Sequence, residues 1–377
     1  MPTPDAILEN ALERATTAID RLIVTDEEIL ERIIVVTRCL TNRAGVRLLM
    51  TCALAKIHRP EVDIRKPYTE IGTSDSFSGR AEYDEKYVWP FASRYQLPLN
   101  ATTAFLTPGF RTINVPLAYP LIISGRPKKM YTDTIQLLDD VYQGKISAED
   151  LLAETLRQLV LLKQEQEGRL GQLLRDLQST SSSVPLSSEE IVNLIEQHLK
   201  SPKSSRLPVL VVAAAYQSAS SKLGEQTRLL QAHNAADLQT GALGDIEIVL
   251  VGDDSVVTSY EIKAKEVTKT DIDLAVQKVA HSGKRVDNYI FVTTDRIDKD
   301  VVAYATSLYR ETAGIEFAIL DCIGFLRHFL HFFHRLRLAF LESYQALVLA
   351  EPESAVSQPL KELFLALRRA AEFDANG

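Results

Sequence analysis

Cysteine is scarce in this chain, which has three in 377 residues. Cys39, Cys52 and Cys322 are widely spaced and match no metal-ligand pattern, so a reduced interior explains them best. The amino terminus is acidic and lacks both the basic and the apolar region of a secretion signal. We therefore expect a cytoplasmic protein.

Two common catalytic signatures and a membrane span are absent as well. No glycine-rich loop of the kind that holds phosphates occurs, so we expect no dependence on ATP. No Gly-x-Ser-x-Gly or comparable setting for a nucleophile occurs either. The aromatic run FLRHFLHFFHRLRLAFL is interrupted by Arg327, Arg335 and Arg337 within too short an apolar length to cross a membrane.

The chain also lacks an excess of positive charge. It has 42 lysines and arginines against 50 aspartates and glutamates, a formal net charge of −8. General nucleic-acid binders usually carry a basic stripe, so this balance argues against that class. A sequence-specific enzyme can still concentrate its positive charge in a cleft. With 46% hydrophobic and 24% charged residues, the composition is that of an ordinary soluble protein, long enough for two lobes.

Two apolar segments carry the most informative residues. The segment GDIEI places Asp245 and Glu247 on one side of a strand, because alternate side chains share a face. The segment YEIKAK does the same for Glu261, Lys263 and Lys265. If the two strands pair, Asp245, Glu261 and Lys263 converge on one small volume.

This set suits metal-dependent cleavage of a phosphodiester. Two carboxylates form a hard oxygen site for Mg²⁺, and we expect Asp245, Glu261 and the Ile262 carbonyl to hold it. Lys263 would orient and help to deprotonate the attacking water. The alternative is that a Glu-x-Lys on a strand is only a solvated edge, which is its commonest role.

The surrounding pattern predicts an ordered series of elements. These are a helix over 221–233, strands over 245–251 and 256–265 joined by a turn at 252–254, a helix from an N-cap at Thr270 to about Ala280, a strand over 288–293, a helix over 301–312 and a strand over 316–320. The apolar stretch 208–215 is either a buried strand or the start of a core helix.

This order of elements and acidic residues resembles PD-(D/E)xK nucleases over residues 205–322. The resemblance implies an α/β (α+β) core, a mixed sheet flanked by helices, with Asp245, Glu261 and Lys263 as catalytic residues. It also implies that Glu225, on the preceding helix, supports the metal site. Gly244 stands where the motif often has proline. Gln277 is followed by His281 instead of a tyrosine, so the RecB-like branch is not supported.

A second resemblance lies in the run from Arg65 through Gly72 to Glu85, which is similar to SacI-type restriction endonucleases. These are type II enzymes that cut within short palindromic DNA sequences. The resemblance implies a homodimer, Mg²⁺, double-stranded DNA as substrate and a cognate DNA methyltransferase as a genetic partner. Arg65, Lys66 and Arg80 are the preferred DNA contacts. The alternative is that these cations pair with nearby acidic residues and only order the loops.

Four regions follow from these patterns. Residues 1–145 form a helical, loop-rich lobe expected to recognise DNA; 146–204 form a helical connector; 205–322 form the nuclease core; and 323–377 form helices for core or dimer packing. In the first lobe, helices are predicted over 5–57 with a capping box at Thr25 and Glu28, and loops and short strands over 60–127. The connector contains a long amphipathic helix over 147–177, a polar linker over 179–183 and a helix from Ser187 to Leu199.

Three histidines near the carboxyl terminus, His328, His331 and His334, recur at intervals of three. On a helix they could bind Zn²⁺. We favour a core or dimer-interface helix, because no carboxylate or cysteine accompanies them and aromatic residues surround them.

A type II restriction endonuclease is the function that these patterns favour. Another DNA nuclease, such as a repair, junction-resolving or modification-dependent enzyme, would share the catalytic lobe. A non-catalytic DNA-binding or scaffold protein would use the long helices as its interface and bind no divalent metal near Asp245 and Glu261.

Overall fold

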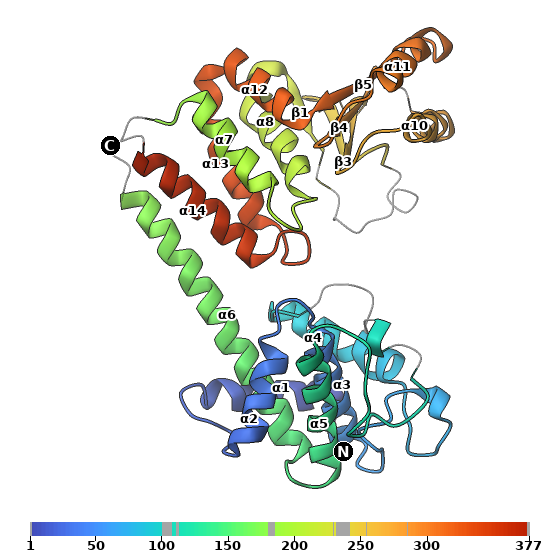
Figure 1. Ribbon diagram of the computed structural model, residues 1–377, viewed down its shortest axis with the longest axis vertical. Helices are drawn as coiled ribbons and strands as arrows, with labels where there is room; N and C mark the ends of the chain where they lie inside the picture. Colours follow the sequence, from blue (N-terminus) through green and yellow to red (C-terminus); the bar gives the residue numbers. More distant parts are fainter. Residues whose placement is uncertain are drawn as a thin grey trace. The chain divides into compact units, whose positions relative to one another are not determined.

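The computed structural model describes residues 2–99, 108–110, 113–179, 185–228, 230, 242–253, 255–284 and 286–374. The chain forms two compact units, Met1–Arg169 and Leu170–Gly377 (Figure 1). Among the residues described, no helix combines the length and the apolar character that a membrane crossing requires.

The first unit is built on helices. They are α1 (Pro4–Thr17), α2 (Glu27–Thr37), α3 (Ala44–His58), α5 (Lys128–Tyr142) and the first part of α6 (Ala148–Ser179). All residues from Ala44 to Ala55 are buried, so α3 is the central helix of this unit. The predicted capping box is off by one residue, because the side chain of Asp26 caps α2 by accepting a hydrogen bond from the Ile29 amide.

The described part of the segment between α3 and α5 consists of loops and short helices. It contains η1 (Thr69–Ile71), η2 (Gly79–Val88), α4 (Trp89–Arg94) and η3 (Pro108–Phe110). The short strands predicted over 60–127 are absent from the described part of that range. The long helix predicted over 147–177 is confirmed as α6, and of the predicted linker over 179–183, residues 180–183 lie outside the described residues.

The second unit contains one five-stranded mixed sheet in the order β1-β2-β3-β4-β5. The strands are β1 (Glu225–Thr227), β2 (Ile246–Leu250), β3 (Val256–Lys263), β4 (Asn288–Thr293) and β5 (Glu316–Asp321). The first three strands pair antiparallel and the last three pair parallel. The parallel connections run through α10 (Lys269–Ser282) and α11 (Lys299–Glu311). A mixed sheet flanked by helices is therefore confirmed.

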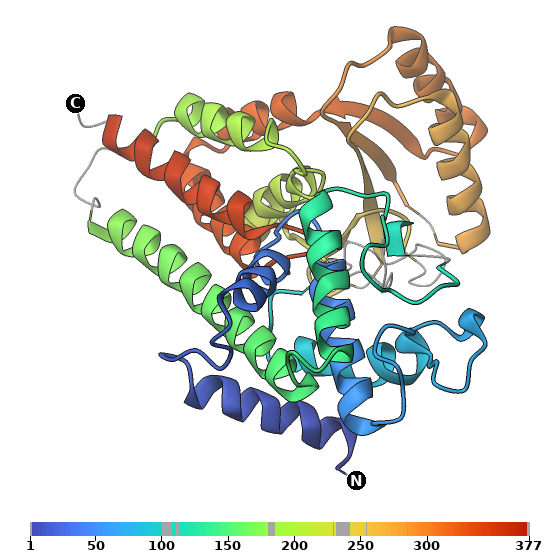
Figure 2. The ribbon, with the colours of Figure 1, turned by 60° about the horizontal axis from the view of Figure 1, so that its bottom comes forward.

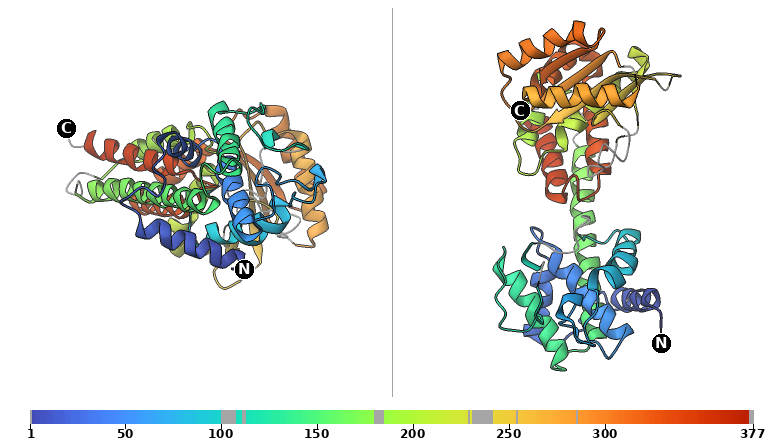
Figure 3. Two further views of the ribbon diagram at one scale, coloured as in Figure 1. Left: turned by 90° about the horizontal axis from the view of Figure 1, so that it is seen from below. Right: turned by 90° about the vertical axis from the view of Figure 1, so that its right-hand side faces the viewer.

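The two faces of the sheet bury different cores. One face packs on a set of helices: α7 (Ser188–Leu199), α8 (Leu207–Leu223), α12 (Cys322–Phe332), α13 (Arg337–Ala350) and α14 (Gln358–Asp374). It contributes Ile246, Ile248 and Tyr260 to that core. The other face, with Tyr289 and Phe291, packs on α10 and α11, which lie side by side along it (Figures 2 and 3).

Local sequence patterns predict most of this unit correctly. The hairpin, β4, α11 and β5 fall within about two residues of the predicted bounds, and α7 begins at the predicted Ser187 cap. The N-cap of α10 is Thr268 instead of Thr270. The helix predicted over 221–233 is wrong for residues 224–228: α8 ends at Leu223, and Gly224, in a left-handed conformation, leads into β1. Residues 229 and 231–233 of that prediction lie outside the described residues. Stretch 208–215 is the first part of α8, one of the two predicted alternatives.

Candidate active site

The register of the β2–β3 hairpin brings the two predicted carboxylates together. Ile246 pairs with Tyr260 and Glu247 with Ser259, so one step further places Asp245 beside Glu261. The Ile262 amide donates a hydrogen bond to Asp245 Oδ2 at 2.7 Å, which fixes this carboxylate against β3. Tyr260 belongs to the core on the α8 side, so Glu261 faces α10.

Gly244 is required at this point because the strands approach closely. A Cβ at position 244 would lie 2.4 Å from the Tyr260 carbonyl oxygen and 2.6 Å from the Ser259 hydroxyl. A side chain would therefore push Asp245 away from β3. The glycine that replaces the motif's usual proline has a physical reason in this chain.

Glu261 contacts two lysines and a tyrosine hydroxyl. Its side chain is 19% exposed and forms an ion pair with Lys263 at 3.0 Å and another with Lys278 at 3.5 Å. The Tyr289 hydroxyl lies 2.9 Å from Glu261 Oε2. Two ammonium groups therefore already lie where a divalent cation would have to be accommodated.

Lys263 lies between two carboxylates. Its Nζ is 3.0 Å from Glu261 and 3.4 Å from Asp271. Burial lowers the pKa of Lys263, but the two carboxylates outweigh that effect and raise it above its ordinary value. Lys263 therefore remains an ammonium ion at neutral pH, where it can donate hydrogen bonds and cannot accept a proton. In this form Lys263 can take the orienting role expected of it.

Asp271 and Lys278 are site residues that the sequence reasoning missed. Asp271 forms a capping box with Thr268 at the start of α10 and turns its other oxygen to Lys263. Burial raises the pKa of Asp271, but hydrogen bonds from Thr268 and the charge of Lys263 lower it overall. The spacing of Asp271 and Lys278, seven residues on one helix, places both on one face and was the available signal.

Glu247 shares the strand face of Asp245 but is already engaged. Its side chain is 8% exposed, and it accepts a hydrogen bond from the Leu243 amide at 3.0 Å. Arg228 lies 3.1 Å and Lys284 3.3 Å from its two oxygens. Glu247 thus holds the segment before Asp245 in place.

The structure contradicts the predicted position of Glu225. This residue lies in β1 opposite Leu250, at the far end of β2 from Asp245, and not on a helix. Thr227 pairs with Ile248, which belongs to the core on the α8 side, and Glu225 is two residues from Thr227 on the same strand, so it shares that face. Glu225 therefore lies on the opposite face of the sheet from Glu261. Sequence periodicity alone does not predict that residues 225–227 form a strand or where that strand pairs with β2.

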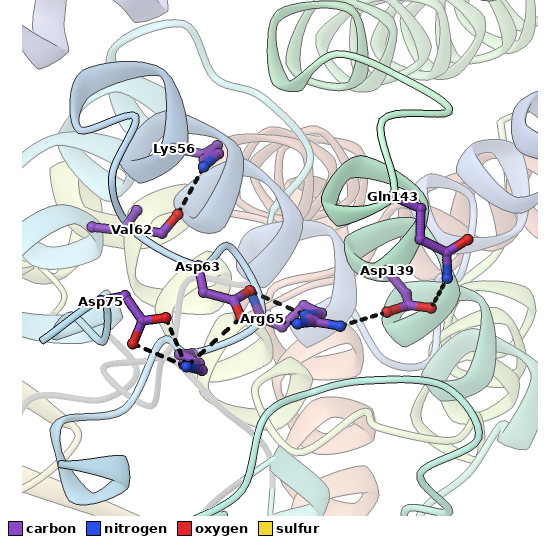
Figure 4. Close-up of polar contacts among 8 residues, drawn as sticks. Lys56, Val62, Asp63, Arg65, Asp75, Asp139 and Gln143 are labelled. Carbon is purple, nitrogen blue, oxygen red and sulfur yellow. Dashed lines mark hydrogen bonds and ion pairs between the residues drawn. The ribbon is translucent and has the colours of Figure 1, made fainter. Parts of the chain in front are cut away.

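The preferred DNA contacts Arg65 and Lys66 both form ion pairs with nearby carboxylates, and Figure 4 shows Arg65 between Asp63 and Asp139. Arg65 binds Asp63 through two hydrogen bonds and Asp139 at 2.9 Å, and its guanidinium carbon lies 3.2 Å from the centre of the Tyr142 ring. Lys66 binds Asp75 at 2.7 Å, and this hydrogen bond lowers the pKa of Asp75 to about 2. These contacts correspond to the alternative interpretation, in which the cations order the loops.

Arg80 is the most accessible of the three predicted DNA contacts. Its side chain is 60% exposed and pairs with Glu85 at 2.7 Å. An exposed pair of this kind contributes little to stability, so the guanidinium can exchange its partner at low cost. Arg80 keeps the properties that a DNA contact needs.

The residues at the hairpin fit a Mg²⁺ ion by donor chemistry. Asp245 and Glu261 supply hard oxygens from adjacent positions, and Mg²⁺ is commonly bound by one or two carboxylates plus water and substrate phosphates. Within the described ranges, no cluster of three or more His, Cys, Asp or Glu side chains has metal-binding geometry. His331 instead binds Glu189 at 2.8 Å, and His328 stacks on Phe332.

One comparison with known proteins bears on this site. Residues 183–294 match the family model of the SacI restriction endonuclease C-terminal domain. The matched range contains α7, α8, the hairpin, α10 and β4, and thus all three predicted catalytic residues of the hairpin. The run from Arg65 to Glu85 lies outside it. A search of the curated proteins found no match. The family match confirms the resemblance to SacI-type enzymes and supports a restriction endonuclease, a nuclease that acts on DNA.

Proposed function

From this resemblance, we propose that the protein is a type II restriction endonuclease that hydrolyses double-stranded DNA at a specific short sequence, with Mg²⁺ as its cofactor. One observation carries the proposal. Asp245, Glu261 and Lys263 meet at one end of the β2–β3 hairpin, inside the region similar to a restriction endonuclease domain. This is the hairpin arrangement expected of a PD-(D/E)xK nuclease core.

Asp245, Glu261 and the Ile262 carbonyl are the groups that would hold the metal. A bound Mg²⁺ would stabilise negative charge on the reacting phosphate and lower the pKa of a bound water. The Ile262 amide donates a hydrogen bond to Asp245. Because Ile262 directly follows Glu261, the backbone of β3 holds Asp245 next to Glu261. Asp245 is held by this bond, and Glu261 by its contacts with Tyr289 and Lys263, before substrate arrives.

Lys263 would supply positive charge and hydrogen bonds to the reacting groups. Its ammonium group is shared between Glu261 and Asp271 and is partly exposed, so it can turn toward a phosphate oxygen or the attacking water. Glu261 and Asp271 both favour its charged form. Donation from Lys263 to the water orients it for in-line attack, with departure of the 3′ oxygen.

DNA recognition is proposed for the first unit, with Arg80 as its best-placed contact. Arg65 and Lys66 would have to break buried or partly buried ion pairs to reach DNA. We therefore assign them the role of ordering the loops around them. A palindromic target implies two copies of the chain, because a homodimer matches the symmetry of the site. A DNA methyltransferase encoded nearby is the expected genetic partner.

The proposal is tested by incubating the purified protein with unmethylated phage DNA and Mg²⁺. We expect discrete fragments from the wild type and none from Lys263→Ala. Lys265→Ala is the matched control, since it removes an exposed lysine two residues further along and should leave the fragments unchanged. Absence of cutting by the wild type, also with Mn²⁺ and with modified or branched DNA, would refute nuclease activity. Unchanged cutting by Lys263→Ala would refute the assigned site.

A further inference from the structure

Tyr289 of β4 connects the two carboxylate-bearing segments of the candidate active site. Its side chain is 0% exposed, and its hydroxyl lies 2.9 Å from Glu261 Oε2 and 2.7 Å from the Leu243 carbonyl oxygen. Glu261 belongs to β3, and Leu243 precedes Asp245 by two residues. One hydroxyl group therefore contacts both sides of the hairpin at the level of the proposed metal site.

The ring of Tyr289 is held rigidly by its neighbours. It stacks on Phe317 with ring centres 5.7 Å apart and lies against Phe291 at 5.3 Å. These aromatic residues belong to the core between the sheet and α10 and α11. Because the ring cannot move without disturbing that core, the hydroxyl presents a fixed point to Glu261.

The hydroxyl has one proton, and the described residues place two acceptors beside it. A carbonyl oxygen and an ionised carboxylate can only accept, so toward these two partners the hydroxyl donates to Leu243 or to Glu261. Both contacts are short enough for a hydrogen bond. If Glu261 turns its oxygen to a cation, the hydroxyl can donate to Leu243, and no buried donor is left without a partner.

We propose that Tyr289 is a positioning residue for Glu261, which holds this carboxylate in register with Asp245 and transfers its hydrogen bond to Leu243 when Glu261 takes up a divalent cation. The inference rests on the proposed function, since it concerns the same site. Outer groups that hold metal ligands commonly fix both their orientation and their affinity. Tyr289 on β4 would orient the proposed metal ligand Glu261 on the neighbouring strand β3 in this way.

The chain offers a matched control on the opposite face of the sheet. Tyr260 is 4% exposed and its hydroxyl lies 2.9 Å from the hydroxyl of Tyr216. Tyr260→Phe and Tyr289→Phe each remove one buried hydroxyl from the same sheet. Only the second removes a contact to Glu261, so a general effect on folding would appear in both.

The test combines cation binding with cleavage. Mn²⁺ affinity is measured by electron paramagnetic resonance of the free ion, and cleavage by single-turnover kinetics on a DNA fragment that the wild type cuts. Tyr289→Phe should lose about 10- to 100-fold in Mn²⁺ affinity or in cleavage rate, the usual effect of removing such a support. Tyr260→Phe should change neither. Equal behaviour of the two variants in both measurements would overturn the proposal.

The readouts separate failure of this inference from failure of the proposed function. If the wild type cuts no DNA, Mn²⁺ affinity still reports on Tyr289 alone. Should Tyr289→Phe fail to fold, fluorotyrosine introduced at this position keeps the ring and the hydroxyl. Its fluorine resonance should shift when Mg²⁺ is added, and an unchanged resonance would refute the link to Glu261.

Discussion

At the scale of single residues, the ammonium group of Lys263 depends on the charges around it. Asp271 lies 3.4 Å from its Nζ and, together with Glu261, keeps its pKa above the ordinary value in spite of burial. If cleavage requires the ammonium form, activity is lost as pH rises through this pKa. The negative charge of Asp271 therefore extends activity toward alkaline pH.

Asp271→Asn should accordingly move the alkaline limb of the pH–rate profile to lower pH, because the pKa of Lys263 falls when the neighbouring charge is removed. The measurement is the cleavage rate across a pH series. Thr268→Ala is the control, since it weakens the α10 cap without changing the charge beside Lys263. An equal shift in the control would attribute the effect to the cap.

Asp245 directly precedes β2 and Glu247 lies within it, and substitutions at the two positions should have different effects. Asp245→Ala should slow cleavage by roughly 100-fold or more, because a metal ligand contributes several kcal/mol to transition-state stabilisation. Glu247→Ala should cost about 1–3 kcal/mol of stability, since it leaves the Leu243 amide, Arg228 and Lys284 without this acceptor. Cleavage assays and urea unfolding of both variants test whether Asp245 acts in catalysis and Glu247 in stability. A stable but inactive Glu247→Ala variant would instead assign Glu247 to catalysis.

At the scale of elements, the approach of β2 to β3 depends on Gly244. Gly244→Ala places a methyl group against the Tyr260 carbonyl and should cost about 1–3 kcal/mol, as overpacking of a close contact usually does. Gly168→Ala in α6 meets nothing within 4 Å and should stabilise the helix by about 0.5–1 kcal/mol. Urea unfolding of the two variants should show opposite signs, and two equal losses would contradict the packing argument.

The same element shows what the sequence could predict. Asp245, Glu261 and Lys263 were found because the alternation of side chains on paired strands is a local property. Tyr289 was missed because its contact with Glu261 depends on the parallel pairing of β4 with β3, across the α10 connection. That pairing depends on how the whole unit packs, so the local sequence around position 289 does not predict the contact with Glu261.

The wrong predictions also arise where contacts between distant parts of the chain decide the local structure. Residues 221–233 have helical spacing, yet residues 225–227 pair with β2, so tertiary contacts override a weak local preference. Glu225 was misplaced along with that helix. In the first unit, the segment after α3 lacks a clear period, and short helices form there by burying Tyr83, Val88 and Phe91.

At the scale of the whole molecule, His198 makes the second unit sensitive to acid. It is fully buried, with Nδ1 3.0 Å from the Tyr344 hydroxyl and Nε2 3.0 Å from the Leu360 carbonyl. Burial lowers the pKa of His198 to about 4, below its ordinary 6.5. The unfolded chain therefore binds the proton more tightly than the native protein does.

Stability should fall by about 3 kcal/mol as pH drops from 6.5 to about 4 and change little from this group outside that window. Urea unfolding at a series of pH values measures the effect. His198→Gln removes the titrating ring, so its stability should depend less on pH over the same interval. Parallel curves for the two proteins would exclude His198 as the source.

The ion pairs of Arg65 and Lys66 have a consequence for how the protein would respond to salt on DNA. Cations that contact phosphates release counterions from the nucleic acid, and the affinity then falls steeply as the salt concentration rises. Arg65 and Lys66 are already neutralised by Asp63, Asp139 and Asp75, so they add little to that release. Replacing either residue should therefore change the salt dependence of DNA binding less than replacing the exposed Arg80 does.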